Sequence, residues 1–417
     1  MKARREHIRV FEHQSIVLNQ QFEDGVIFDQ NKLDAFVRFF EKDVPYYRLI
    51  RNGIQFNEYV GAIQVGNTVI SILPKADKSQ IENGAEKKKW NQILIDMLRA
   101  VHGFDVKAPS SASLRIRNNS VLDLYFELFV LEIEYLLHRG LVKKYRMTED
   151  NLFALKGCLQ FGKHVSKNVV HKERFYTRYA TFDAEHLLHI ILYKTIQVLK
   201  RINTNPALIG RINALFLNFP EVPNKKITEA IFDKLVFNRK TGGYKKAIEI
   251  ARLILMHYHP DLNKGRNDVL ALMFDMNKLW EQFVLVSLKK NKGLKVRGQN
   301  SRYFWKPAGG KRRTIRPDIT ISTNDGDYVL DTKWKLISNK PSIEHIRQMY
   351  AYHHYFEAKK VALLYPGDAL YVVGNFVEIK SQKNLSDIEC GLLFTRYRNS
   401  VIKWQEQIGE EVEKWMA

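Results

Sequence analysis

The chain has 417 residues, 45% of them hydrophobic and 27% charged, values that exclude disorder as the dominant state. At roughly 150 residues per domain, this length predicts two or three domains. Lysine and arginine number 66 against 45 aspartates and glutamates, so the formal net charge is +21 and a polyanionic partner is expected.

The cysteines and the apolar segments indicate in which compartment the protein works and whether it spans a membrane. Cys158 and Cys390 are far apart and occur in no metal-ligand spacing, so the sequence predicts neither a disulfide framework nor a structural zinc site. The basic N-terminus has no apolar segment behind it, unlike a secretory signal. No stretch reaches the ~20 uncharged residues of a membrane span. We therefore expect a cytoplasmic protein that binds nucleic acid and no membrane.

Residues 1–80 are predicted to form a β-rich N-terminal domain. Residues 59–75 read as two strands around the turn signal Gly66-Asn67, and Pro74 closes the second strand. The polar stretch 77–89 then marks a domain boundary.

Residues 81–264 are predicted to form a mainly helical middle domain. Apolar residues recur at helical spacing in four segments, and residues 176–182 are a candidate strand between them. The four predicted helices are 90–100, 122–139, 184–201 and 245–257.

Residues 265–417 change character and are predicted to be an α/β domain. A helix at 270–290 precedes a strand-rich stretch at 315–335, and a helix at 343–356 precedes a strand at 360–364. The predicted fold class is therefore a multidomain α+β protein with a C-terminal α/β domain.

A pair of acids and a lysine mark a hairpin in this last domain. Asp318 begins one strand, and Asp331 and Lys333 follow after the turn-like residues 324–327. Residues two apart on a strand share a face, so two carboxylates and one ammonium group would converge. The simpler alternative is a surface hairpin with solvated charges, because short PD…DxK patterns arise by chance.

Phosphodiester hydrolysis needs this combination of groups. Carboxylate oxygens hold magnesium, which polarises the phosphoryl group and activates water, and a lysine steadies the nucleophile or the developing charge. The hairpin thus has the pattern of a PD-(D/E)XK nuclease site, and its domain is expected to be restriction-endonuclease-like.

Three neighbouring features strengthen this interpretation. Glu281, in the predicted helix upstream, could supply another metal ligand, although a boundary glutamate is the simpler reading. Gln348 and Tyr352 are four apart on one helix face, where they could bind a phosphate or order the lysine.

The third feature is a basic run from Lys289 to Arg316 that contains no acid. Its aromatics Tyr303, Phe304 and Trp305 could stack on exposed bases, and its cations could neutralise phosphates, although a charge run is more often a solvated face. The candidate DNA-binding residues are Lys295, Arg297, Arg302, Lys311, Arg312, Arg313 and Arg316.

Taken in order, these motifs resemble the McrC family, nuclease subunits of modification-dependent (5-methylcytosine) restriction systems. The resemblance covers nearly the whole chain and is strongest around the acids. The matching segments are 59–66, 72–75, 155–161, 273–281, 316–319, 330–335 and 348–352.

The resemblance implies a DNA endonuclease that uses Mg²⁺, with Mn²⁺ able to substitute. Asp318, Asp331 and Glu281 would bind the metal and Lys333 would assist the attack, with Gln348 and Tyr352 in support. It also implies methylated double-stranded DNA as substrate. Dimerisation of the assembled complex would let both strands be cut.

The resemblance further implies a partner, an McrB-like AAA+ GTPase that recognises and translocates DNA. The N-terminal domain would reach into its ring, with Gly66-Asn67 as the candidate contact tip. No P-loop string occurs here, since Trp305 stands where the first glycine before Gly310-Lys311 would be, so no nucleotide is expected on this chain itself. The sequence departs from the family pattern at Trp280, where phenylalanine is expected, and in a longer middle block.

His186 and His189 lack the spacing of a zinc motif and a third ligand, so core or surface histidines are the expected reading. Two alternative functions stay open: a DNA-binding activator of a partner NTPase with a vestigial nuclease site, and a nuclease directed at RNA.

Overall fold

A computed structural model describes residues 6–22, 25–40, 44–75, 84–101, 120–259, 268–291, 293–337, 340–377 and 385–417. The chain divides into two compact units. The larger comprises Arg4–Val121 and Ala271–Ala417, and the smaller comprises Leu122–Leu270. The segments predicted as N-terminal and nuclease domains thus lie in one unit, and the boundaries at residues 80 and 264 stay a prediction.

The N-terminal part of the larger unit is built around the predicted hairpin. Val65 pairs with Thr68, which leaves a two-residue turn, and Gly66 in that turn has a φ of +56°. All residues of the second strand are buried, so the hairpin is an internal part of a sheet rather than a free arm. The strands, in spatial order, are β1 (Glu6–Phe11), β6 (Thr68–Leu73), β5 (Tyr59–Val65) and β11 (Val269–Asp275).

A second, three-stranded sheet and two helices complete this N-terminal part. An aromatic cluster joins the first helix to the small sheet, where the Tyr47 hydroxyl donates to Phe36 O at 2.6 Å. The elements are β2 (Ser15–Val17), β4 (Gly53–Phe56), β3 (Tyr47–Ile50), α1 (Gln30–Phe40) and α2 (Gly84–Val101).

The predicted helix at 270–290 is wrong in its first part, which is strand β11. The strand lies directly beside β5, where a Cβ on Gly61 would meet Leu272 O at 2.1 Å. Helix α9 (Met276–Lys289) begins only after Asp275, whose carboxylate accepts from the amides of Asn277 and Lys278. A short apolar run does not distinguish a buried strand from a buried helix, so the pattern misled.

The C-terminal part contains a six-stranded sheet with a mixed topology. Its central strands β16, β17 and β19 run parallel, and the hairpin β15–β16 is antiparallel as predicted. In spatial order the strands are β12 (Lys295–Gly298), β15 (Ile319–Thr323), β16 (Gly326–Thr332), β17 (Ala358–Pro366), β19 (Leu385–Thr395) and β18 (Val372–Val377).

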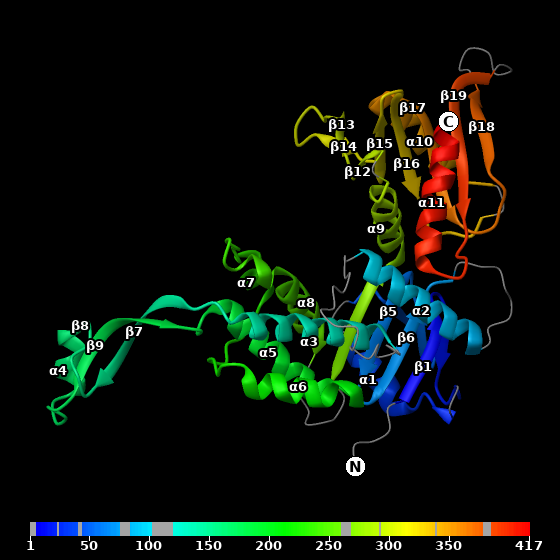
Figure 1. Cartoon of the computed structure of the whole chain (residues 1–417). Coiled ribbons are helices and arrows are strands. Elements are labelled where there is room, and N and C mark those ends of the chain that lie inside the picture. Colours follow the sequence, from blue (N-terminus) through cyan, green and yellow to red (C-terminus); the bar gives the residue numbers. More distant parts are fainter. Residues whose placement is uncertain are drawn as a thin grey trace. The chain divides into compact units, whose positions relative to one another are not determined.

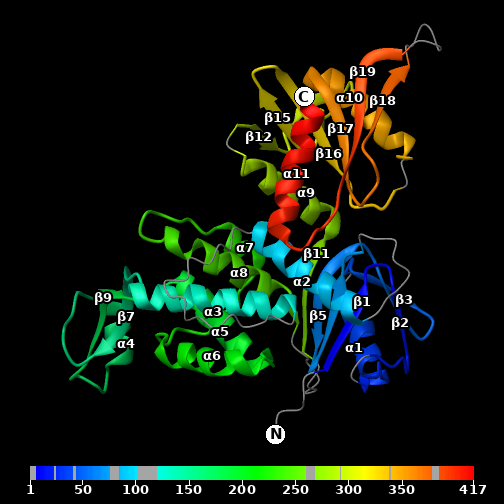
Figure 2. The same cartoon turned by 45° about the vertical axis from the view of Figure 1, so that its right-hand side comes forward.

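Helices cover both faces of this sheet (Figure 1; Figure 2). Helix α10 (Ile343–Phe356), predicted with the same bounds, packs Met349 and Phe356 against Val329 and alternate residues of β17. On the other face, α11 (Val401–Met416) accepts hydrogen bonds at its C-terminal carbonyls from Tyr328 and Lys360. The result is a three-layer α/β arrangement, and α11 was not predicted.

A two-stranded ribbon leaves the edge of this sheet (Figure 1). It consists of β13 (Arg302–Trp305) and β14 (Arg313–Ile315), and it carries much of the basic run. The return strand leads within three residues into Asp318.

The smaller unit is mainly helical, as predicted for the middle block. Its helices pack through apolar faces, and no helix among the described residues is long and apolar enough to cross a membrane. The elements are α3 (Val121–Arg139), which begins one residue before the unit, α5 (Leu187–Ile202), α6 (Pro206–Asn218), α7 (Glu229–Asp233), α8 (Lys245–Met256) and β10 (Tyr258–His259).

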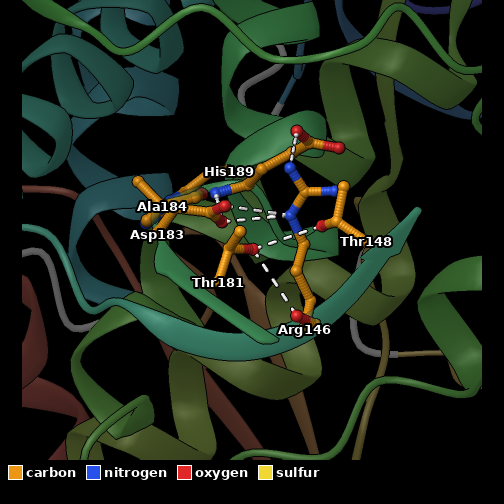
Figure 3. A network of polar contacts seen from close by, with 7 residues as sticks. Arg146, Thr148, Thr181, Asp183, Ala184 and His189 are labelled. Carbon is orange, nitrogen blue, oxygen red and sulfur yellow. Dashed lines mark hydrogen bonds and ion pairs between the residues drawn. The ribbon is translucent and has the colours of Figure 1, made fainter. Parts of the chain in front are cut away.

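A long hairpin extends from these helices. Strands β7 (Lys144–Leu152) and β9 (Phe175–Asp183) pair antiparallel along their whole length, with β8 (Cys158–Leu159) and α4 (Phe161–Lys167) near the far end. At its base, Arg146 forms ion pairs with Asp183 and Glu185 at 3.0 and 2.5 Å (Figure 3). The pair with Asp183 joins the two strands, and the pair with Glu185 joins the hairpin to the residues just before α5.

Candidate active site

The hairpin register brings the two predicted acids together. Ile319 pairs with Leu330, so Asp318 and Asp331 stand opposite each other one position beyond that pair. Asp331 is 1% exposed, and its Oδ2 lies 2.5 Å from Nζ of Lys333. Apart from this ion pair, Oδ2 has no partner among the residues that the structure describes. The two acids and the lysine thus converge at the end of β16.

Asp318 is held by the residue that follows Asp331. Its Oδ2 accepts hydrogen bonds from the amide of Thr332 at 2.7 Å and from the Thr332 hydroxyl at 2.9 Å. This arrangement orients Asp318 toward the end of the neighbouring strand.

Glu281 reaches the same region from α9, where it is buried. The Gln299 side-chain amide donates to Glu281 Oε1 at 2.8 Å, and the Gln299 backbone amide donates to Asp318 O at 2.8 Å. Gln299 has a left-handed φ of +52° directly after β12. One residue therefore connects two candidate ligands. Sequence reasoning missed it, because only the close approach of β12 to α9 gives it this role.

The acids influence one another electrostatically. Burial, and then the nearby charge of Asp318, raise the pKa of Asp331 to about 6, whereas Lys333 acts to lower it. Burial also raises the pKa of Glu281, while its hydrogen bond with Gln299 opposes that rise. Carboxyls that disfavour each other's charge in this way are suited to a cation that would relieve the repulsion.

The site has donors for a metal but not a closed ligand set. Among the described residues, no three His, Cys, Asp or Glu side chains are arranged so that they could hold a metal ion. Asp318 faces Thr332, Glu281 faces Gln299, and Asp331 faces Lys333. Carboxylate oxygens are hard ligands that fit Mg²⁺ in chemistry, and Asp331 Oδ2 has only the Lys333 ammonium as a partner among the described residues. Side-chain rotation would be needed to bring the three carboxylates to one ion.

Gln348 and Tyr352 lie on α10, on one side of the site. The Gln348 amide donates to the Tyr352 hydroxyl at 2.7 Å, and that hydroxyl donates to Arg316 O at 2.8 Å. Burial, and then the charge of Asp331, raise the pKa of Tyr352. The pair therefore holds the backbone two residues before Asp318, and in this structure neither side chain bonds Lys333.

Two buried tryptophans are sequence neighbours of the site residues Glu281 and Lys333, and they contact each other. Trp280 precedes Glu281, Trp334 follows Lys333, and their rings are 5.4 Å apart. Trp280 Nε1 and the Lys333 amide both donate to Leu364 O. The bulky residue at position 280 is thus accommodated in the core, where it is fully buried.

Trp334 is bonded in turn to an acid of the N-terminal part. Its Nε1 donates to Glu12 Oε1 at 2.9 Å, and the Lys75 amide donates to the same oxygen at 2.9 Å. Burial raises the pKa of Glu12 to about 7, against the effect of both hydrogen bonds. Sequence reasoning missed Glu12, because the contact spans 322 residues.

The predicted DNA-binding residues lie along one chain segment beside the site. Lys295 and Arg297 are exposed on the edge strand β12, and the others occupy the ribbon and the residues that link it to β15. Arg302 differs from the rest, because its guanidinium donates to Tyr355 O at 2.7 Å. None of the seven forms an ion pair within the described part of the chain, so their charges are available to an anion.

His186 and His189 each hydrogen-bond a backbone carbonyl of the smaller unit, Val142 O and Ala184 O. His189 Nδ1 donates to Ala184 O at 2.6 Å (Figure 3). Its Nε2 accepts from the Tyr244 hydroxyl at 3.0 Å. Burial lowers the pKa of His189 to about 4. The His189 ring is therefore neutral, and both of its nitrogens are hydrogen-bonded. Both cysteines are free thiols, Cys158 exposed and Cys390 buried.

Comparisons with known proteins give this chain a family and a similar fold. A family model described as McrBC 5-methylcytosine restriction system component matches residues 54–366, more than half of the chain. A search of curated proteins finds no match.

Two solved structures from Thermococcus gammatolerans have a similar fold. One is a refined half-complex from a tetradecameric assembly of McrB AAA+ hexamers with bound McrC. It has a TM-score of 0.68 and 20% identity, and the match covers 98% of this chain and 100% of that chain. The other, a cryo-EM structure of the McrBC complex, has a TM-score of 0.50 and 21% identity, with 68% and 88% covered. At these identities the likeness establishes the fold alone.

Proposed function

Because the chain belongs to the family of McrBC 5-methylcytosine restriction system components, we propose that it is the DNA endonuclease subunit of such a system. It acts in the cytoplasm with a separate McrB-like AAA+ GTPase, which recognises and translocates methylated double-stranded DNA. The observation that carries the proposal is the convergence of Asp318, Asp331 and Lys333 at the end of β16.

Each group of the site has a distinct task in this proposal. Asp318, Asp331 and Glu281 would hold Mg²⁺, which polarises the scissile phosphoryl group and activates water when bound. Lys333 lies within 2.5 Å of Asp331, so its ammonium is positioned to orient the attacking water or balance developing charge. Gln299 orients Glu281, and Tyr352 fixes the backbone at Arg316.

DNA would approach along the basic segment. The exposed cations of β12 and of the ribbon follow one stretch of chain into Asp318, without acidic neighbours in sequence. Such cations release counterions from phosphates and provide affinity that does not depend on base sequence.

A partner surface is supported by the long hairpin of the smaller unit. Monomeric proteins rarely expose many large apolar side chains together, and such patches commonly bind other proteins. On β7, β9, α4 and their connections the exposed apolar side chains include Tyr145, Met147, Phe153, Leu155, Phe161, Val165 and Phe182.

This hairpin surface and the predicted contact tip at Gly66-Asn67 are therefore two alternative contact sites for the GTPase. We expect Phe153→Asp to weaken capture of the GTPase, and Asn67→Asp is the matched test of the other site. Pull-down of the purified partner with each variant decides between them, since only the variant at the real contact should lose binding.

The central experiment combines the purified chain with its GTPase, GTP, Mg²⁺ and methylated DNA. Asp331→Ala should abolish strand breaks while leaving folding and GTP turnover intact. A variant that cuts as fast as the wild type would refute the proposed site. Cleavage of RNA in competition with DNA would instead favour an RNA-directed nuclease.

The alternative is a DNA-binding activator whose nuclease site is vestigial. It is favoured by one observation: each candidate acid already faces a donor of the protein, and no metal-ready group of three occurs among the described residues. The same reconstitution separates the two functions, because an activator raises GTP turnover without breaking a strand.

A further inference from the structure

The ribbon β13–β14, here called the aromatic ribbon (residues 302–315), is a built surface beside the site. Arg302 pairs with Ile315 and Tyr303 with Thr314, and a bulge separates the latter pair from the next. All four residues of β13 are exposed. Its three consecutive aromatics, Tyr303, Phe304 and Trp305, are exposed on a short strand, which requires an explanation beyond folding.

One part of the aromatic ribbon fixes it to α10. The Arg302 guanidinium donates to Tyr355 O at 2.7 Å and lies 5.1 Å from the Phe356 ring centre. Phe304 packs on Tyr355 with ring centroids 4.9 Å apart. The same helix holds Arg316 O through Tyr352. The ribbon is thus anchored to the helix that positions the strand of Asp318.

The other aromatics are left available. Trp305 is 57% exposed and contacts no other ring or cation within the described residues. Tyr303 is 66% exposed, with the Arg312 guanidinium 4.8 Å from its ring centre. Arg313 pairs opposite Trp305, and Lys306 and Lys311 lie in the connection between the two strands. All three are exposed, with no ion pair to a described residue. Open ring faces among uncompensated cations complement bases that are attached to phosphates.

We propose that the aromatic ribbon binds unpaired bases, so that the double-stranded substrate is engaged where a short single-stranded segment lies next to the cut. The inference rests on the proposed nuclease function and names its substrate class. In an intact duplex the base faces are already stacked and inaccessible, so a side-chain ring gains stacking energy only from bases that are unstacked.

The position of the ribbon agrees with this role. Trp305 pairs opposite Arg313, which is five residues before Asp318 in the chain. Five extended residues span at most about 18 Å. At 3.4 Å per stacked nucleotide, this equals about five nucleotides. A strand cut near Asp318 and Asp331 would therefore reach Trp305 with bases close to the scissile phosphate.

The test measures binding by the full chain without divalent metal, so that no cleavage occurs. Fluorescence anisotropy is recorded with a labelled single strand, a duplex, and a duplex with a short single-stranded gap. Trp305→Leu removes the ring and keeps an apolar side chain, and Trp305→Phe keeps a ring. Tyr135→Leu, at an exposed aromatic on helix α3 of the smaller unit, is the matched control.

We expect Trp305→Leu to weaken binding of single-stranded and gapped DNA by about 5- to 100-fold and of duplex by less than about twofold. Trp305→Phe and Tyr135→Leu should stay close to wild type. In contrast, Lys306→Ala should weaken binding of all three DNAs to a similar degree, because it removes a phosphate contact.

Equal losses on duplex and gapped DNA with Trp305→Leu, or no loss on any DNA, would overturn the proposal. If Trp305→Leu lost capture of the GTPase but kept its DNA binding, the proposal would also be overturned, because the aromatic ribbon would then bind protein. Failure of the nuclease function itself gives a different result, namely no strand breaks with the partner and Mg²⁺ whatever the ribbon binds.

Discussion

Two buried carboxyl groups in the larger unit invite comparison. Asp331 lies at the end of β16 and Glu12 directly after β1, and they are 1% and 7% exposed. Burial raises the pKa of Asp331 to about 6 and that of Glu12 to about 7. Asp331 is surrounded by ions, with Lys333 in contact and Asp318 opposite. Glu12 is bonded by neutral donors, the Trp334 indole and the Lys75 amide.

The difference shows that a raised pKa does not by itself identify a catalytic acid. Neutral donors stabilise an acceptor oxygen whether or not the carboxyl is ionised, so Glu12 can serve as a structural link in either form. A neighbouring ammonium keeps a buried carboxylate charged, which is what a metal ligand requires. In the proposed nuclease, the catalytic role therefore falls to Asp331, and Glu12 has a positioning role through Trp334.

The largest effect should come from removing the cation beside Asp331. Lys333→Met is expected to slow cleavage by more than about 100-fold, because it deletes a positioned charge at the reacting phosphate. Lys333 also lowers the pKa of Asp331, so its loss should move the rising limb of the pH–rate profile to higher pH. Lys335→Met, at an exposed lysine two residues on, is the control, and equal rates for both variants would contradict the assignment.

Glu12 should influence stability rather than the chemical step. Below pH 4.5 its carboxyl is protonated in both states, and from there to about pH 7 only the unfolded chain releases the proton. Stability should therefore fall as pH rises across this window, by on the order of 3 kcal/mol.

Glu12→Gln tests this effect, because an amide keeps the acceptor oxygen for Trp334 and Lys75 without a charge. The free energy of unfolding of wild type and Glu12→Gln is measured with denaturant from pH 4 to 8. A substitution at an ordinary surface residue would change it by only ~0.5 kcal/mol. The variant should show a flatter pH dependence and higher stability above pH 7. A parallel decline in both proteins would show that Glu12 does not titrate as described.

Gln299 is expected to influence metal binding through its hydrogen bond to Glu281. Its hydrogen bond lowers the pKa of Glu281, so Gln299→Ala should raise that pKa and leave more of the carboxyl protonated at neutral pH. Residues that orient a ligand typically change metal affinity by about 10- to 100-fold. Mg²⁺ titrations followed by thermal shift report the loss. Asn300→Ala is the neighbouring control, and identical titrations for both variants would exclude this role.

The smallest effect is expected at Tyr352. Tyr352→Phe removes the hydrogen bonds to Arg316 O and Gln348 and should cost about 1 kcal/mol of stability. Cleavage should slow only modestly, because the site residues themselves remain. Tyr350→Phe on the same helix is the control for unfolding measurements. A loss of cleavage as large as that of Lys333→Met would mean that Tyr352 touches the substrate.

The sequence by itself determined the local pieces of this protein. Turn signals and periodicity predicted the hairpin at 59–75 and helix α10, because they depend on backbone preferences of neighbouring residues. The spacing of Asp318, Asp331 and Lys333 also predicted their convergence, since a hairpin register follows from its turn. Short-range rules were sufficient wherever the contacts were short-range.

Tertiary structure decided what long-range contacts control. It made residues 269–275 a strand, because β5 offered a paired edge that the apolar run alone does not reveal. It enclosed the N-terminal hairpin in a sheet, brought Glu12 to Trp334, and aimed Gln299 at Glu281. These contacts join segments far apart in sequence, so their partners are set by packing and not by spacing.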